Sequence, residues 1–235
     1  MLMPFRYEGE DVSRCWCGGT LGSSRSPLVG ECVECGTGVL RRRLTEASYE
    51  RWYATSDYRR WVMGTDDVSA GQLAKETRRA FAVIDFHNGC ACGMTGRSIL
   101  DVGSGAGGML LAASRLAPSA ILGVDTDKRS QAIPESFSIP VITHMPPTHL
   151  RFERIICSHL IEHIVRPIAF LQMLAGYLDT DGCIYVETPA WGPKAEVKLP
   201  HPFMYTGESF RVLAKRVGLK VVAMDDGIRA VLRRA

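Results

Sequence analysis

The C-terminal two thirds of the chain alternate between short apolar runs and segments whose apolar residues recur at helical spacing. The helical spacing predicts helices near residues 110–116, 167–178 and 207–217, and Asp179-Thr-Asp-Gly182 predicts a turn. Strands that alternate with helices in this way are typical of an α/β fold. The apolar runs predict strands at residues 98–102, 121–124, 141–144, 155–157, 183–187, 220–224 and 228–232.

The segment 99–127 carries the strongest functional signal. An apolar strand runs into D-x-G-x-G-x-G at residues 101–107, a helical pattern follows, and a second apolar strand ends on Asp125. This order predicts a right-handed βαβ unit that binds a nucleotide-like ligand. The glycines let the backbone turn tightly and approach the ligand with no Cβ in the way. Asp125 is placed to accept hydrogen bonds from both hydroxyls of a ribose.

The spacing of the glycines separates this segment from two other nucleotide-binding motifs. The dinucleotide fingerprint is G-x-G-x-x-G, whereas here the glycines are spaced G-x-G-x-G, with Asp101 two residues before the first. No Lys-Ser or Lys-Thr pair follows the glycines, which excludes a phosphate-binding P-loop. The carboxylate of Asp101 is unfavourable beside a pyrophosphate but favourable beside an ammonium group.

On these residues the chain resembles the class I S-adenosylmethionine-dependent methyltransferases, whose first motif is an acid followed by x-G-x-G-x-G. The segment from Ser158 to Pro167 contains L-x-E-H, and it is similar to the fourth motif of small-molecule methyltransferases of the ubiquinone-biosynthesis type. The sequence from Gly182 through a strand to Thr-Pro also resembles that family. The resemblance implies a Rossmann-like, doubly wound α/β sheet of seven mostly parallel strands. Its last two strands would form an antiparallel hairpin, with the turn at Asp225-Asp-Gly227.

The resemblance also implies which residues bind the methyl donor. Many relatives carry an acid after the third strand that binds the adenine amino group. Here residues 144–147 read His-Met-Pro-Pro instead, so the adenine contacts stay open. The expected donor-binding residues are Asp101, Gly103, Ser104, Gly105, Gly107, Asp125, Thr126 and Ser158.

Residues 45–90 form a helical segment rich in aromatic side chains, with a break at residues 64–67. Most such aromatic residues pack in a core or in a lid. Related methyltransferases cover the cofactor with tyrosines and arginines from an N-terminal helical lid. That resemblance makes Tyr53, Tyr58 and Arg59 further candidates for contact with the donor.

Four cysteines near the N-terminus form two close pairs, separated by fourteen residues. Two such pairs predict two knuckles that close on one tetrahedral Zn²⁺, and a site of four thiolates is structural because it leaves no open position. The surrounding segment has too few large apolar residues for a core, so the metal would supply its folding free energy. The first pair is C-x-C rather than the usual C-x2-C, and Cys90-Ala-Cys92 is an alternative source of a ligand. The predicted zinc ligands are Cys15, Cys17, Cys32 and Cys35.

With this cysteine module, the chain resembles bacterial methyltransferases that act on sugars or natural products. We therefore expect a small-molecule acceptor and an in-line displacement that depends mainly on positioning. A hydroxyl or carbon acceptor also needs a base, which is most often a histidine. The candidates are His159, His163 and His201, each with structural hydrogen bonding as the alternative role. His201 lies in the long loop at residues 191–205, which we expect to cap the acceptor pocket at the carboxyl edge of the sheet.

Composition narrows the remaining function classes. The chain of 235 residues can hold one α/β domain and a small appendage, and its net charge of +3 is too small to indicate nucleic-acid binding. No apolar run approaches the ~20 residues of a membrane span, and the first residues show no apolar core of a secretory signal. We expect a cytoplasmic protein with reduced cysteines. Its predicted domains are a zinc-binding module at 1–44, a helical lid at 45–90 and a donor-binding catalytic domain at 91–235.

Three other functions stay open. An RNA methyltransferase with an RNA-binding zinc module is disfavoured, because the chain has no [DN]-P-P-[YF] motif and no cysteine-nucleophile pattern. A non-catalytic interaction protein is disfavoured by the intact glycine motif and Asp125, and an NAD(P) enzyme by the glycine spacing. The sequence leaves open the acceptor, the methylated atom (O, N or C) and the oligomeric state.

Overall fold

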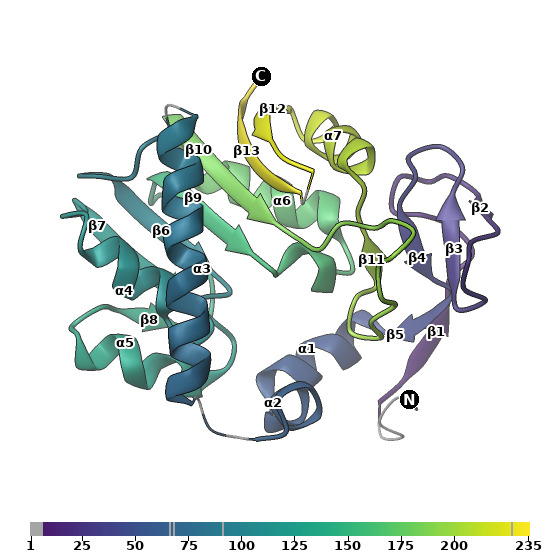
Figure 1. Ribbon diagram of the computed structural model, residues 1–235, viewed down its shortest axis with the longest axis horizontal. Helices are drawn as coiled ribbons and strands as arrows, with labels where there is room; N and C mark the ends of the chain where they lie inside the picture. Colours follow the sequence, from purple (N-terminus) through teal and green to yellow (C-terminus); the bar gives the residue numbers. More distant parts are fainter. Residues whose placement is uncertain (1–6, 66, 68, 91, 227) are drawn as a thin grey trace. The chain divides into compact units, whose positions relative to one another are not determined.

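The main sheet has the order β12-β13-β10-β9-β6-β7-β8 in the computed structural model, which describes residues 7–65, 67, 69–90, 92–226 and 228–235 (Figure 1). β6 pairs in parallel with β7 and β9, and β7 pairs in parallel with β8. β12 and β13 form the antiparallel hairpin, whose predicted turn residue Gly227 lies outside the described residues. The predicted mostly parallel sheet of seven strands is confirmed. Its strands are β6 (Ser98–Val102), β7 (Ala120–Val124), β8 (Val141–Ile142), β9 (Phe152–Ser158), β10 (Leu178–Glu187), β12 (Leu219–Met224) and β13 (Arg229–Arg234).

The chain divides into two compact units. The first holds the described residues within 1–51, 158–175 and 186–235, and the second holds those within 52–157 and 176–185. The domain boundaries predicted from the sequence stay a prediction. Among the described residues, no helix combines the length and the apolar character needed to cross a bilayer.

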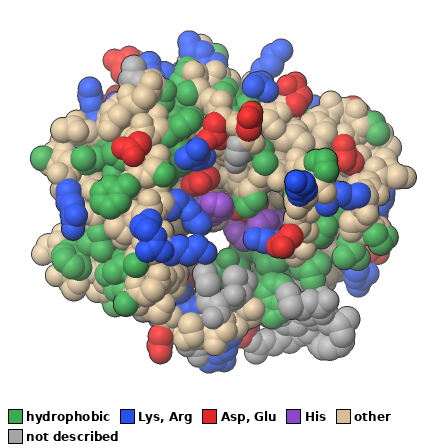
Figure 2. All heavy atoms as spheres, viewed as in Figure 1, with side chains coloured by type: hydrophobic (Ala, Val, Ile, Leu, Met, Phe, Trp, Pro, Cys, Tyr) green, Lys and Arg blue, Asp and Glu red, His purple; other side chains and the backbone are tan. Residues whose placement is uncertain are grey.

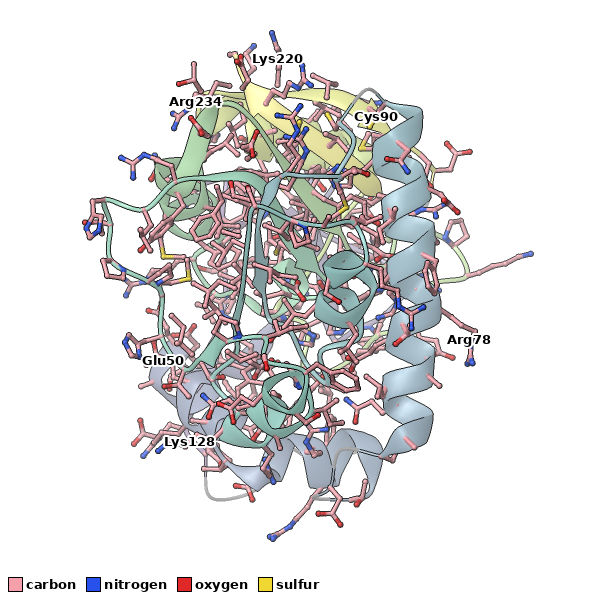
Figure 3. All side chains as sticks on the ribbon, turned by 90° about the vertical axis from the view of Figure 1, so that its left-hand side faces the viewer. Glu50, Arg78, Cys90, Lys128, Lys220 and Arg234 are labelled. Carbon is pink, nitrogen blue, oxygen red and sulfur yellow. The ribbon has the colours of Figure 1, made fainter. Side chains whose placement is uncertain are left out.

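In the second unit, long helix α3 (Ala70–Gly89) packs against α4 (Gly108–Ser114), the helix that follows the glycine turn (Figure 1). The side chain of Ser69 caps α3 by accepting a hydrogen bond from the backbone of Gln72. Figure 3 shows Arg78 projecting outward from α3, and Cys90 at its carboxyl end. The other helices of this unit are α2 (Ser56–Met63), the 3-10 helix Lys128–Gln131 and α5 (Ala132–Ser136).

The predicted first helix of the lid is interrupted at Thr55. The chain forms α1 (Glu46–Ala54) and then α2, because the Thr55 side chain accepts a hydrogen bond from the backbone of Asp57 and starts a new helix. α2 ends where Gly64 adopts a left-handed conformation with φ of 72°. The predicted break before α3 is therefore in place.

In the first unit, the cysteine module contains a four-stranded sheet of order β11-β4-β3-β2. Its edge strand β11 comes from the loop at residues 191–205, and Phe203 pairs with Val39 and Met204 with Gly38. Trp191 lies over Gly38, where a Cβ would stand 3.0 Å from the indole ring. The long loop is thus part of the module's sheet. The strands are β2 (Leu21–Gly22), β3 (Val29–Cys32), β4 (Gly38–Leu40) and β11 (Phe203–Met204), beside a separate pair β1 (Gly9–Asp11) and β5 (Arg42–Leu44).

The predicted turn at residues 179–182 is wrong. α6 (Pro167–Tyr177) leads directly into β10, which runs unbroken from Leu178 to Glu187. Residues 179–181 are exposed, so their polar character reflects solvent at the start of the strand rather than a turn. α7 (Gly207–Arg216) follows the loop and begins with a capping box between Thr206 and Ser209.

Candidate active site and metal centre

The glycine turn between β6 and α4 uses left-handed backbone conformations at three positions. Gly103, Gly105 and Gly107 have φ values of 77°, 56° and 84°, a region that residues with a Cβ rarely adopt. At Gly107 a Cβ would also clash with the ring of Pro134. The predicted need for glycine at these positions therefore has a steric basis in the structure.

Asp125, at the end of β7, reaches across to this turn. One of its carboxylate oxygens accepts a hydrogen bond from the backbone N–H of Gly105 at 2.8 Å, and the other accepts from Asp127 at 2.9 Å. Burial raises the pKa of Asp125 to about 6, although the two backbone hydrogen bonds lower it. The structure thus brings the expected ribose-binding acid and the glycine turn together.

Asp101 and Ser104 are buried beside the same turn with unsatisfied polar atoms. Within the described residues, neither Oδ2 of Asp101 nor Oγ of Ser104 has a hydrogen-bond partner. Burial, together with the nearby charges of Glu76 and Asp125, raises the pKa of Asp101 to about 8. An orphaned acid among other carboxylates is a favourable place for an ammonium group.

Glu76 of α3 is a site residue that the sequence analysis missed. Its carboxylate accepts a hydrogen bond from the backbone N–H of Ala106 at 2.8 Å and another from the side chain of Gln72 at 2.9 Å. The only local signal is the four-residue spacing of Gln72 and Glu76 on one helix face. Nothing in that spacing indicates that the face packs on the glycine turn.

The helical segment is tied to the residues after Asp125 through Arg59. The buried guanidinium of Arg59 donates to the carboxylate of Asp127 at 3.1 and 3.2 Å. Tyr53 and Tyr58 pack against each other, with ring centroids 4.7 Å apart. These three candidates lie in the same unit as the glycine turn.

The remaining candidate donor-binding residues are Thr126 and Ser158. Thr126 stands between Asp125 and Asp127 at the end of β7, where the backbone hydrogen bonds to Asp125 are made. Ser158 ends β9 and belongs to the first unit, where its hydroxyl donates to Glu187 at 2.7 Å.

The three candidate histidines gather around one buried acid in the first unit. His159 follows β9 with a left-handed φ of 53°, an unusual conformation for a residue with a Cβ. Its Nδ1 lies 3.2 Å from Oε1 of Glu162, and its Nε2 lies 3.6 Å from Oε1 of Glu187. The imidazole of His159 therefore stands between two carboxylates.

His163 and His201 form an edge-to-face pair, with ring centroids 4.7 Å apart. Nδ1 of His163 lies 3.1 Å from the carbonyl oxygen of Pro200. Burial lowers the pKa of both histidines, that of His201 to about 3. The ring of His201 is consequently neutral at pH 7.

The four N-terminal cysteines lie together and are all buried. Sγ of Cys15 is 3.6 Å from Sγ of Cys35, and Sγ of Cys17 is 3.5 Å from Sγ of Cys32. A hydrogen bond from Cys15 lowers the pKa of Cys35 to about 5, whereas burial raises the pKa of Cys17 to about 11. Four convergent thiols at these distances suit a tetrahedral ion.

A glycine closes the cysteine cluster, since a Cβ on Gly19 would stand 2.7 Å from the sulfur of Cys32. Cys90 and Cys92 are not members of the cluster. The thiol of Cys90 donates to the carbonyl of His87, and Cys92 is buried beside Cys183. The predicted set of four is the one that the structure assembles.

Comparison with solved structures supports the fold. A 1,6-didemethyltoxoflavin-N1-methyltransferase from Burkholderia thailandensis matches with a TM-score of 0.59 and 13% identity, covering 89% of this chain and 96% of that one. Magnesium protoporphyrin IX methyltransferase from Synechocystis PCC 6803 matches with a TM-score of 0.58 and 12% identity, covering 81% and 100%. The CcbJ methyltransferase from Streptomyces caelestis matches with a TM-score of 0.52 and 12% identity, covering 68% and 89%.

Sequence comparison gives the family. No curated protein matches the chain. The family model described as "Methyltransferase domain" matches residues 72–224, which include most of α3, the glycine turn, Asp125 and the three candidate histidines. The chain therefore belongs to the methyltransferase-domain family, the class I S-adenosylmethionine-dependent enzymes that its glycine motif resembles.

Proposed function

We propose that this enzyme transfers a methyl group from S-adenosylmethionine to a small-molecule acceptor, with His159 as the base and with a structural Zn²⁺ on the four cysteines. The observation that carries the proposal is the glycine turn, where Asp125 and the orphaned carboxylate of Asp101 converge. Two of the matching structures are named as methyltransferases of a magnesium porphyrin and of didemethyltoxoflavin, which supports a small-molecule acceptor.

The residues at the glycine turn fit the ribose and the ammonium group of the donor, and they leave its adenine unassigned. Asp125 would bind the ribose hydroxyls, since its carboxylate lies against the turn, with one oxygen accepting from Gly105 and the other from Asp127. Asp101 would bind the ammonium group, which satisfies its orphaned Oδ2 and relieves repulsion from Glu76. When bound, S-adenosylmethionine supplies an electrophilic methyl group on a sulfonium. The protein contributes position and a negative environment for that cation.

His159 is the best-placed base of the three histidines. Its side chain is 30% exposed, whereas burial weakens His163 and His201 as bases by lowering their pKa values. With its Nδ1–H donated to Glu162, Nε2 is the atom that takes the proton. Glu187, 3.6 Å from Nε2, then stabilises the imidazolium.

The acceptor class is testable with donor labelled on the methyl group. We expect label to enter the small-molecule fraction of a cell extract when enzyme is present, and not the RNA or protein fractions. Label found only in RNA would contradict the proposal and favour the RNA methyltransferase.

We expect His159→Ala to reduce turnover by about 10²- to 10⁴-fold, the usual contribution of a positioned base. The variant removes no residue of the glycine turn, so the affinity for S-adenosylhomocysteine should not change. Initial rates of label transfer and calorimetry measure the two quantities. His149→Ala, at an exposed histidine of the second unit, is the matched control and should keep full turnover. If the His159→Ala variant also keeps full turnover, the base is another residue.

Donor binding should strengthen as the pH rises from 6 toward 7.5. With a pKa of about 8, Asp101 is mostly protonated in the free protein at these pH values. An ammonium group favours the carboxylate, so binding lowers this pKa and releases a proton, and affinity rises up to tenfold per pH unit. Ionisation of Asp125, which has a pKa of about 6, should also strengthen donor binding as the pH rises, but over a lower pH range.

Titration with S-adenosylhomocysteine in two buffers of different ionisation enthalpy measures the released proton. Asp101→Asn should abolish this release around pH 7, because the amide matches the protonated acid in shape but cannot ionise. Glu76→Gln should shift the pH-dependent increase in donor affinity to lower pH, since Glu76 helps to raise the pKa of Asp101. Identical binding heats in both buffers for the unmodified protein would show that Asp101 does not face the ammonium group.

A further inference from the structure

We propose that Glu162, His163 and His201 bind a divalent first-row transition-metal ion, at a site separate from the four cysteines. One ligand atom from each residue lies within 4.8 Å of the other two. Two ligands of one such ion, each bound at about 2.1 Å, are at most ~4.2 Å apart. Small side-chain rotations therefore bring all three onto one ion.

Two separate segments of the first unit deliver these ligands. Glu162 and His163 end the 3-10 helix Ile161–His163, which begins two residues after the left-handed His159. His201 comes from the loop at residues 191–205, where its backbone N–H donates to the carbonyl of Lys198 at 2.9 Å. The hydroxyl of Tyr49 holds the same loop by donating to Leu199 at 3.3 Å. The site is thus fixed by backbone structure on both sides.

Glu162 is the residue that most needs a cation. It is 1% exposed, and its Oε2 has no hydrogen-bond partner within the described residues, while its Oε1 faces His159. A buried, ionised oxygen without a partner is strongly unfavourable unless a positive charge lies beside it.

The two imidazoles are prepared as ligands. A carbonyl oxygen only accepts, so the contact between Pro200 and Nδ1 of His163 places the hydrogen on Nδ1 and the lone pair on Nε2. A hydrogen bond from the second ring nitrogen to a carbonyl is the usual support for a metal-bound histidine. His201 is buried too, and its ligand atom lies within 4.8 Å of those of Glu162 and His163.

The ligand set also indicates the ion and what it binds. Two imidazoles and a carboxylate suit Zn²⁺, Fe²⁺ or Co²⁺ better than Mg²⁺ or a soft ion that prefers thiolate ligands. Three protein ligands leave at least one position open, unlike the four cysteines. Resting on the proposed function, this open position would take an oxygen of the acceptor and lower the pKa of its hydroxyl. Figure 2 shows histidine side chains near the middle of one face, with acidic and basic side chains around them.

Cobalt titration of the zinc-loaded protein tests the site. We expect one equivalent of Co²⁺ to bind beyond the zinc, with weak d–d absorption and no thiolate charge-transfer band. Glu162→Gln and His201→Ala should each weaken this binding at least a hundredfold, and His149→Ala should not change it. Retained zinc and unchanged binding of S-adenosylhomocysteine verify the fold of each variant.

Wild-type protein that binds no cobalt beyond the cysteine site would overturn the proposal, as would variants that bind cobalt equally well. Where a variant fails to fold, X-ray absorption of the cobalt-loaded wild type decides instead. A first shell with two imidazoles supports the site, and a shell of thiolates or of oxygens alone contradicts it. The titration uses neither donor nor acceptor, so its result is independent of whether methyl transfer to a small molecule is demonstrated.

Discussion

Substitution of Asp125 by alanine is expected to weaken binding of S-adenosylmethionine at least a hundredfold. The change removes the carboxylate that accepts from the backbone of Gly105 and Asp127 and that would bind the ribose hydroxyls. Hydrogen bonds to a charged group contribute about 1.5–3 kcal/mol each, so two lost bonds to the ribose amount to about 3–6 kcal/mol. Calorimetric titration with S-adenosylmethionine measures the loss.

Asp125→Asn keeps one accepting oxygen and most of the shape, so its affinity should fall between those of the wild type and the alanine variant. Asp179→Ala, at the exposed start of β10, is the control for a general effect of removing an acid. Gly103→Val should abolish binding by a different route, because φ of 77° strains a β-branched residue. Normal affinity of the Asp125→Ala variant for S-adenosylmethionine would show that the donor does not bind at this turn.

Loss of the proposed zinc should have the largest effect on the first unit. Structural zinc in small modules contributes about 10–16 kcal/mol of folding free energy, and the cysteine module includes β11 and its loop. We therefore expect Cys32→Ser to release the zinc, to expose residues 191–205 to proteolysis and to abolish turnover. Binding of S-adenosylhomocysteine should persist, since the glycine turn lies in the second unit.

Metal analysis, limited proteolysis and calorimetry on the same preparation measure these three effects. Cys90→Ser is the matched control, because its thiol donates to His87 outside the cluster. It should keep both zinc and turnover. A Cys32→Ser enzyme that still turns over would show that the module is dispensable for catalysis.

The part of the fold that the sequence predicted depends on local patterns. The glycine turn, Asp125 and the two cysteine pairs are each encoded within a few residues, and the structure places them as their spacing indicates. The error at residues 179–182 has the same origin, because exposed polar residues at the start of a strand look like a turn.

Contacts between distant segments were not predictable in this way. Glu76 lies in an ordinary helix, and only the packing of α3 on α4 brings it to Ala106. β11 is two residues long, too short for an alternating pattern. His201 meets Glu162 because that short strand anchors its loop, so the sequence supplied the histidines but not the acid at their centre.

The pairing of β11 with β4 limits how this enzyme can be recombined. In the sequence the N-terminal module has the form of a separate unit only because the strand that completes its sheet lies more than 160 residues further on, where Phe203 pairs with Val39. A chimera that transfers the module alone would leave the edge of β4 without its partner, and such open edges promote aggregation. Exchange of acceptor specificity between relatives should therefore succeed only when the module and the 191–205 loop are transferred together.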